Sequence, residues 1–389
     1  MVSSVVFIKC VAFLGRHYSL LPHPKRLFCK DKMDLTSSLD LSRLSRTASR
    51  ILEVVDSHTC GQPTRVVIAG ADLAPGLDPN EAREQLRGER DWVRRVSVFE
   101  PRGHRSMFSV ALIPPAHPGG DYGLVYMDAA TYPDMCGHAT IGAATTLIEL
   151  GLVGPTMPGY DGVFEFGLRT PAGRVELRAT LKNGRCQAVA FRLGFAFFLC
   201  TLELRVGDGR TVPVHIAHGG QWYAFVDVNA AGLRIDANAI DALIAAAQDI
   251  RARIAAQLTM ADPSSGKPPV VGNIVWTDTP RDPQAAGFNV PVSAAGSFDR
   301  SPCGTATCAR MAALVALGQL EIGQSFINEG LMGTLYRGMP VGADMRDKIS
   351  GIIPQVEGSA WITGHSRLLV DERDPLGNGY LVGGGPAVL

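Results

Sequence analysis

One stretch of this chain occurs twice, and the repetition limits the folds that the chain can adopt. The copies are residues 135–151 and residues 302–318, which align without a gap. They share Cys, Gly, Ala, Thr, two Leu and the closing Gly. Self-similarity of this kind is typical of one supersecondary unit that is used twice. We therefore expect two related halves, each built around one copy.

Both copies are predicted to be helices. Small and straight-chain residues dominate them, and apolar positions recur at helical spacing. The closing Gly151 and Gly318 stand where a C′ glycine ends a helix. Asp134 and Ser301 are favoured N-cap types, and Pro302 suits the first helical position because its missing N–H would be unpaired there. Each copy would then carry a cysteine in its first helical turn.

Cys136 and Cys303 are the candidate reactive groups. In a first turn the backbone N–H groups lack helical partners and the helix dipole is positive, so we expect a thiolate to be favoured there. The same amides can bind a substrate carboxylate, and Gly137 and Gly304 would let it approach closely.

Two cysteines from two related halves suit proton transfer at a carbon. Moving a proton from one face of a carbon beside a carboxylate to the other requires two groups on opposite sides of it. One of them must be deprotonated and the other protonated. Two facing helix starts would also stabilise the charge that builds up on the carboxylate.

Composition excludes several other classes. A chain of 389 residues with 19% charged and 46% hydrophobic residues is typical of a globular protein of two or three domains. Lys plus Arg and Asp plus Glu both number 37, so nucleic acid and membranes are not expected partners. Eight cysteines without a CxxC pair predict free thiols in a reducing compartment, the cytoplasm. The chain carries no Rossmann, P-loop or zincin motif.

The remaining sequence is rich in strand patterns and predicts an α+β fold. Lys182-Asn183-Gly184 is a strong hairpin signal. The other expectations that matter below are strands at 51–55 and 64–69 with a loop over 56–63, a helix over 79–93, a helix over 239–258 with Asn238 as N-cap, and a strand over 330–336.

Several motifs closely resemble those of the proline racemase family, which includes hydroxyproline 2-epimerases and trans-3-hydroxyproline dehydratases. The strongest are residues 135–142 and 299–307, around the two cysteines. Residues 56–59, 99–104, 170–173 and 371–375 add to the resemblance, which covers nearly everything from Val54 to Asp374.

The resemblance implies a diaminopimelate-epimerase-like fold of two pseudo-symmetric domains, each a curved, mainly antiparallel sheet around a central helix, with the active site between them. It implies neither pyridoxal phosphate nor a metal. Cys136 and Cys303 match the two catalytic bases, and Asp299 matches the residue that contacts the ring nitrogen. The family residues that bind the substrate carboxylate are matched here by Gly137, His138, Gly304 and Thr305.

The domain boundaries follow from this resemblance. We expect a first domain over 51–180, completed by 355–389, and a second over 181–354. Residues 1–50 are predicted to be a poorly ordered N-terminal extension with Met33 as the functional start, although a signal peptide and a transit peptide stay open. The expected partner is a small substrate, proline or hydroxyproline, and a homodimer is possible.

The retained cysteine pair selects among the reactions of this family. Dehydratases typically replace one of the cysteines with Ser or Thr, so inversion at Cα is favoured over elimination. The sequence of residues 58–61 resembles that of hydroxyproline 2-epimerases, which points to conversion of trans-4-hydroxy-L-proline to cis-4-hydroxy-D-proline. Two departures bear on the substrate: Ala286 stands where such epimerases often have a His that meets the ring hydroxyl, and Arg105 follows His104 where an acid is frequent.

Other readings stay open. On the same scaffold they are a proline racemase, a 3-hydroxyproline 2-epimerase and a trans-3-hydroxy-L-proline dehydratase. A non-catalytic amino-acid-binding protein would be expected to have lost one cysteine, and this chain has both. His58 and His104 could serve either loop hydrogen bonds or the active site.

Overall fold

The computed structural model describes residues 40, 42–155, 157, 159–207, 209–263 and 265–382. Within them, sixteen strands form one continuous sheet. The strands of the first half are β1 (Arg50–Thr59), β2 (Gln62–Ala69), β3 (Ser109–Ile113), β4 (Tyr122–Met127), β5 (Gly162–Thr170), β6 (Gly173–Lys182), β7 (Arg185–Arg192) and β16 (Ala360–Val370). Those of the second half are β8 (Ala196–Arg205), β9 (Thr211–His218), β10 (Trp222–Asp227), β11 (Asn273–Asp278), β12 (Gly287–Val292), β13 (Phe326–Gly330), β14 (Leu335–Arg346) and β15 (Ile349–Gly358).

The helices are fewer and mostly short. They are α1 (Ser42–Ser45), α2 (Pro79–Arg87), α3 (Trp92–Val98), α4 (Gly137–Glu149), the 3₁₀ turn η2 (Ala237–Ala239), α5 (Ile240–Gln257) and α6 (Gly304–Ala316).

The two halves have the same topology. The first half has the strand order β16-β1-β2-β3-β4-β5-β6-β7, and the second runs β8-β9-β10-β11-β12-β13-β14-β15. Two neighbouring pairs are parallel in each half, β2–β3 and β4–β5 in the first and β10–β11 and β12–β13 in the second. These pairs fall at equivalent places, as do helices α4 and α6, which follow the fifth strand of each order. The predicted α+β class with two pseudo-symmetric domains is confirmed.

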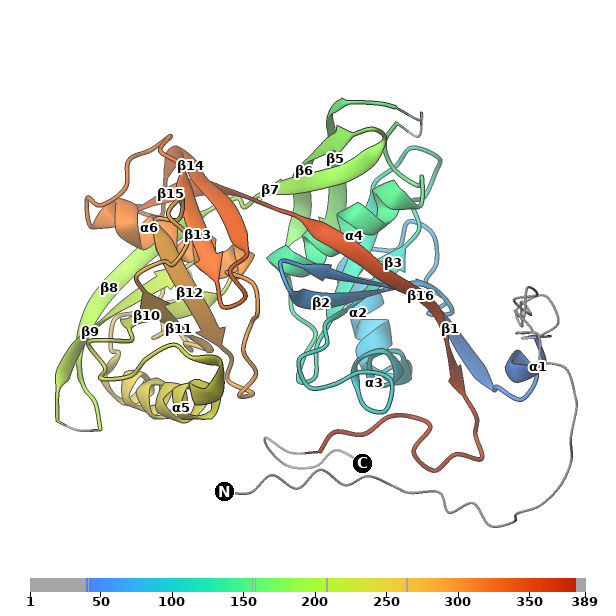
Figure 1. Ribbon diagram of the computed structural model, residues 1–389, viewed down its shortest axis with the longest axis horizontal. Coiled ribbons are helices and arrows are strands. Elements are labelled where there is room, and N and C mark those ends of the chain that lie inside the picture. Colours follow the sequence, from blue (N-terminus) through green and yellow to red (C-terminus); the bar gives the residue numbers. More distant parts are fainter. Residues whose placement is uncertain are drawn as a thin grey trace, which may run out of the picture. The chain divides into compact units, whose positions relative to one another are not determined.

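Long strands connect the halves. β15 pairs with β14 and β8, which closes β8–β15 into a ring, and it also pairs with β7 of the first half. The chain then continues as β16, which lies antiparallel to β1 (Figure 1). The last long strand of the chain thereby completes the first half. The exact domain boundaries at 180 and 354 stay a prediction.

Each half encloses one of the repeated helices. Helix α4 packs against β1, β2, β7 and β16, and α6 packs against β8, β9, β14 and β15 (Figure 1). Every residue from Gly137 to Ile148 is buried, which explains why small residues dominate the helix. A helix with small side chains on all sides can be surrounded by a curved sheet.

Both repeated helices end as predicted. Gly151 has φ +69° and Gly318 has φ +70°, the left-handed conformation that glycine adopts at low cost. In the first copy Leu152 N–H donates to the carbonyl of Leu147 at 2.9 Å, and Gln319 N–H does the same to Leu314 at 2.8 Å. These bonds define a Schellman motif at each end.

Several local predictions were wrong. Residues 56–59 belong to β1 rather than to a loop, because Ser57 and Thr59 are buried in alternation on the strand. The helix expected over 79–93 is broken at Gly88 into α2 and α3. Asp236, not Asn238, caps η2, since its carboxylate accepts from the N–H of Asn238. Residues 331–334 form the turn between β13 and β14, so no single strand spans 330–336. The hairpin turn at Asn183 and Gly184 is confirmed.

The N-terminal prediction concerns mainly residues 1–39 and 41, which lie outside the described residues. The chain divides into units 1–44 and 45–389, and the sheet belongs to the second. In the part of the chain that the structure describes, no helix is both long and apolar enough to span a membrane. All six cysteines in that part are free thiols.

Candidate active site

Helix α4 begins at its cysteine. Cys136 is the N-cap residue, with φ −145° and ψ 118°, and its carbonyl accepts from the N–H of Thr140 at 2.9 Å and from the Thr140 hydroxyl at 2.7 Å. The predicted N-cap Asp134 is wrong: its side chain is exposed and forms an ion pair with Arg83. The cysteine therefore lies one position earlier than a first-turn residue.

Helix α6 begins in the same way but with a different backbone. Cys303 is the N-cap, so Pro302 is not the first helical residue, and Ser301 is not the N-cap. Ser301 instead accepts a hydrogen bond from Cys303 N–H through its hydroxyl, at 3.1 Å. Cys303 has φ +62° and ψ 117°. For a residue with a side chain such a conformation costs about 1–3 kcal/mol, and it persists only where the surroundings enforce it.

The two helix starts touch each other. A Cβ added to Gly137 would lie 3.1 Å from the Cα of Gly304, and one added to Gly304 would lie 3.2 Å from the Cα of Gly137. Both would also lie 2.9 Å from Cζ of Phe191 on β7. These glycines are therefore needed so that the helix starts can approach each other over one aromatic ring, a reason that the sequence did not reveal.

Five of the seven predicted site residues line one pocket of about 260 Å³. They are Cys136, His138, Asp299, Cys303 and Thr305. Gly137 and Gly304 are buried next to them at the helix contact. The duplicated cysteines, which are 167 positions apart in the chain, thus face the same space.

Cys136 has an imidazole beside it. Nδ1 of His138 lies 3.2 Å from Sγ of Cys136. The ring is buried and meets Phe108 edge-on, with ring centres 4.9 Å apart. Thr59 donates its hydroxyl to the His138 carbonyl at 2.8 Å, which fixes the backbone of this turn. Burial lowers the pKa of His138, partly opposed by the charge of Asp299, which favours the neutral ring.

Cys303 has hydroxyl groups beside it instead. The Thr305 hydroxyl lies 3.7 Å from Sγ of Cys303, and the Tyr223 hydroxyl lies 3.8 Å from it. These two hydroxyls are bonded to each other at 2.6 Å. Tyr223 was missed by sequence reasoning, because within the sequence it is only a buried strand residue 80 positions from the cysteine.

The ionisation of the thiols differs from the expectation. Burial raises the pKa of Cys136 well above its usual value, and it raises the pKa of Cys303 to about 12. Backbone amides of Ala139 and Ala306 act in the opposite direction, as predicted for a helix start, but desolvation is larger. Burial of both thiols therefore opposes the thiolate that a helix start is expected to favour.

Asp299 contacts both sides of the site. Its Oδ1 accepts from the backbone N–H of Ser301 at 2.9 Å and from its hydroxyl at 2.8 Å. Its Oδ2 lies 4.0 Å from Nδ1 of His138. One oxygen therefore orders the loop before Cys303, and the other faces the pocket region.

Other candidate residues divide between the pocket and the surrounding loops. Nδ1 of His58 accepts from Gly61 N–H and Nδ1 of His104 accepts from Ser106 N–H, so both stabilise loops and neither lines the pocket. Arg105 does line it. Ala286 is exposed, its N–H donates to the carbonyl of Ile327 on β13, and it does not line the pocket.

Gln62 is a further lining residue that the sequence did not indicate. Its Oε1 accepts from the backbone N–H of Arg300 at 3.0 Å, and its Nε2 donates to the carbonyl of Ser106 at 3.2 Å. One buried amide on β2 thus ties the loop before Cys303 to the loop that carries Phe108.

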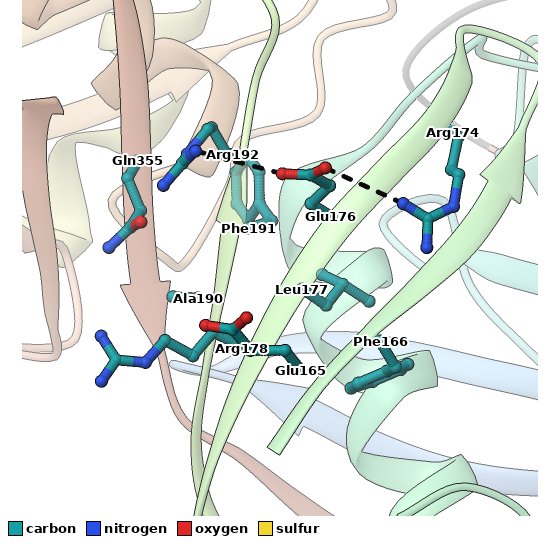
Figure 2. Close-up of a pocket in the computed structure, with 10 residues that line it drawn as sticks. All are labelled: Glu165, Phe166, Arg174, Glu176, Leu177, Arg178, Ala190, Phe191, Arg192 and Gln355. Atoms are coloured by element: carbon teal, nitrogen blue, oxygen red, sulfur yellow. Dashed lines mark ion pairs between the residues drawn. The ribbon is translucent and has the colours of Figure 1, made fainter. Parts of the chain in front are cut away.

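A second hollow lies outside this site. Its lining residues lie on β5, β6, β7 and β15 (Figure 2). Its volume is about 350 Å³. Glu176 lies between Arg174 and Arg192, at 3.9 and 4.0 Å, and Phe191 forms part of the wall. Its described lining includes neither cysteine nor histidine and none of the predicted site residues. Elsewhere in the described ranges, no group of three His, Cys, Asp or Glu side chains is placed to hold a metal ion.

The chain is similar to known proteins over most of its length. A sequence profile described as proline racemase matches residues 54–381. The proline racemase of Clostridioides difficile is 34% identical over 336 residues, which are 86% of this chain and 99% of that protein. The 4-hydroxyproline 2-epimerase 2 of Rhizobium rhizogenes is 35% identical over 329 residues, 84% of this chain and 98% of that protein.

Solved structures agree with this similarity. A hydroxyproline epimerase from Agrobacterium vitis, with bound trans-4-hydroxy-L-proline, has a TM-score of 0.74 at 25% identity over 86% of this chain and 96% of that one. A predicted epimerase from Pseudomonas aeruginosa, 16% identical with a TM-score of 0.51 over 83% of this chain and all of that one, shares the fold. The diaminopimelate-epimerase-like fold is thereby confirmed.

Proposed function

Because the chain belongs to the proline racemase family, we propose that it inverts the configuration at Cα of a proline-type amino acid, and that its substrate is 4-hydroxyproline. The reaction would convert trans-4-hydroxy-L-proline to cis-4-hydroxy-D-proline. Relatives that are named 4-hydroxyproline 2-epimerase support this substrate. The observation that carries the proposal is that Cys136 and Cys303, the N-caps of the two duplicated helices, line the same pocket.

In the proposed mechanism the two thiols act on opposite faces of Cα. One, as thiolate, removes the proton, while the other, as thiol, delivers its own proton to the opposite face. The roles are exchanged for the other enantiomer. Cysteine suits this task because one sulfur holds one proton at a time and is polarisable.

The two helix starts would hold the substrate carboxylate. Backbone N–H groups in first turns carry partial positive charge, and those at Gly137, His138, Gly304 and Thr305 belong to two such turns in contact. As the proton leaves Cα, negative charge spreads onto the carboxylate, and fixed amides stabilise it without reorganisation. Oδ2 of Asp299 would accept from the ring nitrogen.

His138 would support Cys136 in this scheme. A neutral imidazole whose Nδ1 carries the hydrogen can donate to the thiolate across the observed 3.2 Å. This donor offsets part of the desolvation that raises the pKa of the thiol. The hydroxyls of Thr305 and Tyr223 would serve Cys303 in the same way.

A panel of substrates in deuterated water tests the proposal. Trans-4-hydroxy-L-proline, L-proline and trans-3-hydroxy-L-proline are each incubated with the protein, and products are followed by chiral chromatography and NMR. We expect inversion with deuterium at Cα, fastest for trans-4-hydroxy-L-proline. Faster inversion of L-proline would show that the protein is a proline racemase. Faster inversion of trans-3-hydroxy-L-proline would show that it is a 3-hydroxyproline 2-epimerase. Pyrroline-2-carboxylate would indicate a dehydratase, and binding without exchange would contradict the enzyme assignment.

Proline is the second candidate substrate, for a specific reason. Met107 and Phe108 line the pocket, Phe108 in the same apolar cluster as Cys136, and such apolar side chains give a ring hydroxyl no partner. Polar lining residues such as Gln221 and Asn273, bonded to each other at 3.0 Å, favour hydroxyproline instead. Replacing Asn273 with Leu should lower kcat/KM for trans-4-hydroxy-L-proline more than for L-proline, and an equal loss for both would contradict the hydroxyl contact.

A further inference from the structure

The unusual backbone at Cys303 is held by named side chains. The peptide that joins Pro302 to Cys303 is fixed at both ends: its carbonyl accepts from Nδ2 of Asn289 at 3.2 Å, and its N–H donates to the hydroxyl of Ser301 at 3.1 Å. Turning this peptide over would bring Cys303 to an ordinary negative φ, but it would break both bonds. The clamp therefore maintains φ at +62°.

Asn289 is itself fixed from the other side. It is fully buried on β12, and its Oδ1 accepts from Nη1 of Arg310 on α6 at 2.6 Å. The same nitrogen donates to the carbonyl of Phe288 at 2.9 Å. Burial lowers the pKa of Arg310 to about 10, so the group stays charged at neutral pH. A charged donor on Oδ1 leaves Nδ2 directed at the carbonyl of Pro302.

Two glycines make space for this arrangement. A Cβ on Gly287 would lie 2.8 Å from Nη1 of Arg310. A Cβ on Gly330 of β13 would lie 2.7 Å from the nitrogen of Pro302 and 2.8 Å from the carbonyl carbon of Ser301. The loop before Cys303 is thus packed against backbone with no side chain between them.

The peptide that joins Cys303 to Gly304 is fixed as well. Its carbonyl accepts from the N–H and the hydroxyl of Thr307, at 2.9 and 2.7 Å. Because the Cα–Cβ direction of a residue follows from its two flanking peptides, these bonds set where the thiol points. Cys136 has φ −145°, extended backbone that any residue adopts, so only the second cysteine depends on such a clamp.

Resting on the proposed two-base function, we propose that Asn289, held by Arg310, is a positioning residue that fixes the carbonyl of Pro302 and thereby aims the Cys303 thiol into the pocket. It does not touch the substrate. Its loss should leave the Cys136 side unchanged and misplace only Cys303.

Site-resolved alkylation tests the clamp without requiring turnover. Asn289→Leu removes the donor at similar volume, and Asn289→Asp keeps the shape and the contact with Arg310 while replacing the donor with an acceptor. Iodoacetamide labelling at each cysteine is measured by peptide mass spectrometry. We expect labelling of Cys303 to slow about tenfold, because the misplaced thiol loses the hydroxyls of Thr305 and Tyr223 that stabilise its anion. Labelling of Cys136 should stay within about twofold.

Two further variants separate positioning from general destabilisation. Ser301→Ala releases the other end of the same peptide and should reproduce the change at Cys303. Thr146→Val removes an equally buried hydrogen bond, from the Thr146 hydroxyl to the Gly142 carbonyl at 2.8 Å, and should change neither cysteine. Folded Asn289 variants that label like the wild type, or in which both cysteines slow equally, would overturn the proposal.

Isotope effects extend the test to catalysis. In the Asn289 variants kcat should fall about 100-fold with a smaller change in KM, as expected when a catalytic group is misplaced. With substrates deuterated at Cα, the isotope effect on kcat/KM should rise for the enantiomer that Cys303 deprotonates, because removal of that deuterium is the slowed step. For the other enantiomer the isotope effect should fall, because the slowed step is then the delivery of a solvent-derived proton by Cys303. Equal changes for both enantiomers would contradict positioning of Cys303 alone. A wild type that inverts no substrate would refute the proposed function, while the labelling would still test the clamp.

Discussion

The start of α4 and the start of α6 have the same plan but different side chains. In both, a cysteine is the N-cap, a glycine follows it, and a threonine four residues later donates its hydroxyl to the cysteine carbonyl at 2.7 Å. Around Cys136 the backbone is ordinary and the partner is the His138 ring. Around Cys303 the backbone has φ +62° and the partners are the hydroxyls of Thr305 and Tyr223.

This difference shows which parts of a duplicated site are fixed by its chemistry. In the proposed mechanism the helix starts and their glycines bind one carboxylate from two sides, which would keep them alike. The groups beside the sulfurs can diverge, since each has only to stabilise one thiolate. The two proposed bases would therefore be equivalent in role, while their environments differ. The predictions below test first what they share and then what separates them.

The largest effect is expected from Cys136→Ser and Cys303→Ser. Each removes one of the two proton carriers, and a serine hydroxyl does not supply an anion at neutral pH, so kcat for inversion should fall by at least about 10³-fold in both. Polarimetry measures the loss, and circular dichroism checks the fold. Appreciable turnover by either variant would break the proposed equivalence of the bases.

Gly137→Ala and Gly304→Ala should come next, with similar losses. In either variant the new methyl group meets Phe191 and the opposite glycine, so the helix starts must move apart. A displacement of about 1 Å at the site can cost about 100-fold in kcat/KM. A planar analogue such as pyrrole-2-carboxylate should bind more weakly to both variants, measured by calorimetry. A large effect in one variant and none in the other would show that only one helix start holds the carboxylate.

His138→Leu should affect Cys136 alone. Loss of a hydrogen bond to a charged group costs about 1.5–3 kcal/mol, which corresponds to about 10- to 100-fold in kcat. Alkylation at Cys136 should slow while Cys303 keeps its rate, and His138→Gln, which retains a donor, should recover part of the activity. If Cys136 in the leucine variant is labelled at the wild-type rate, the imidazole does not stabilise the Cys136 thiolate.

The pH dependence should follow from the raised pKa of both thiols. The mechanism needs one thiolate, and the fraction of a thiol in that form grows about tenfold per pH unit below its pKa. Since both pKa values are raised above that of a free cysteine, about 8.5, kcat/KM should rise from pH 6 through pH 8.5. A stopped-flow or polarimetric profile that is flat between pH 6 and 8 would show that a thiolate already exists at rest.

Tyr223→Phe should have the smallest effect. It removes one neutral hydroxyl, which corresponds to about 0.5–1.5 kcal/mol, or about 2- to 10-fold in kcat. The change should appear in the labelling rate of Cys303 and leave Cys136 unaffected. A loss as large as that of His138→Leu would mean that the two cysteines depend equally on their neighbours.

The features that could be predicted from the sequence are those that depend on residues close together in the chain. Gly151 and Gly318 end their helices because a left-handed residue is needed there, and Asn183-Gly184 turns a hairpin for the same reason. The pairing of Cys136 with Cys303 was predictable because the repeat itself implied two equivalent positions. The N-cap assignments failed by two residues, since a cysteine is an uncommon N-cap type and Asp134 and Ser301 are favoured ones.

The rest depended on contacts between distant strands. Phe191, Tyr223 and Asn289 are ordinary buried strand residues in the sequence, and only the sheet order brings them to the helix starts. The desolvation of the two thiols could not be inferred from the sequence for a related reason. Desolvation depends on the whole surroundings of a group, whereas the helix dipole could be inferred from the local sequence.

The central claim is that two sulfurs act on opposite faces of one Cα, one removing the substrate proton and the other delivering its own. The most direct measurement is the isotopic content of both product and remaining substrate in deuterated water, at less than about a tenth of full conversion. A monoprotic base on each face predicts that the inverted product carries deuterium at Cα while the remaining substrate retains protium. Product that keeps the hydrogen of its own substrate, or deuterium entering the substrate without inversion, would contradict the account.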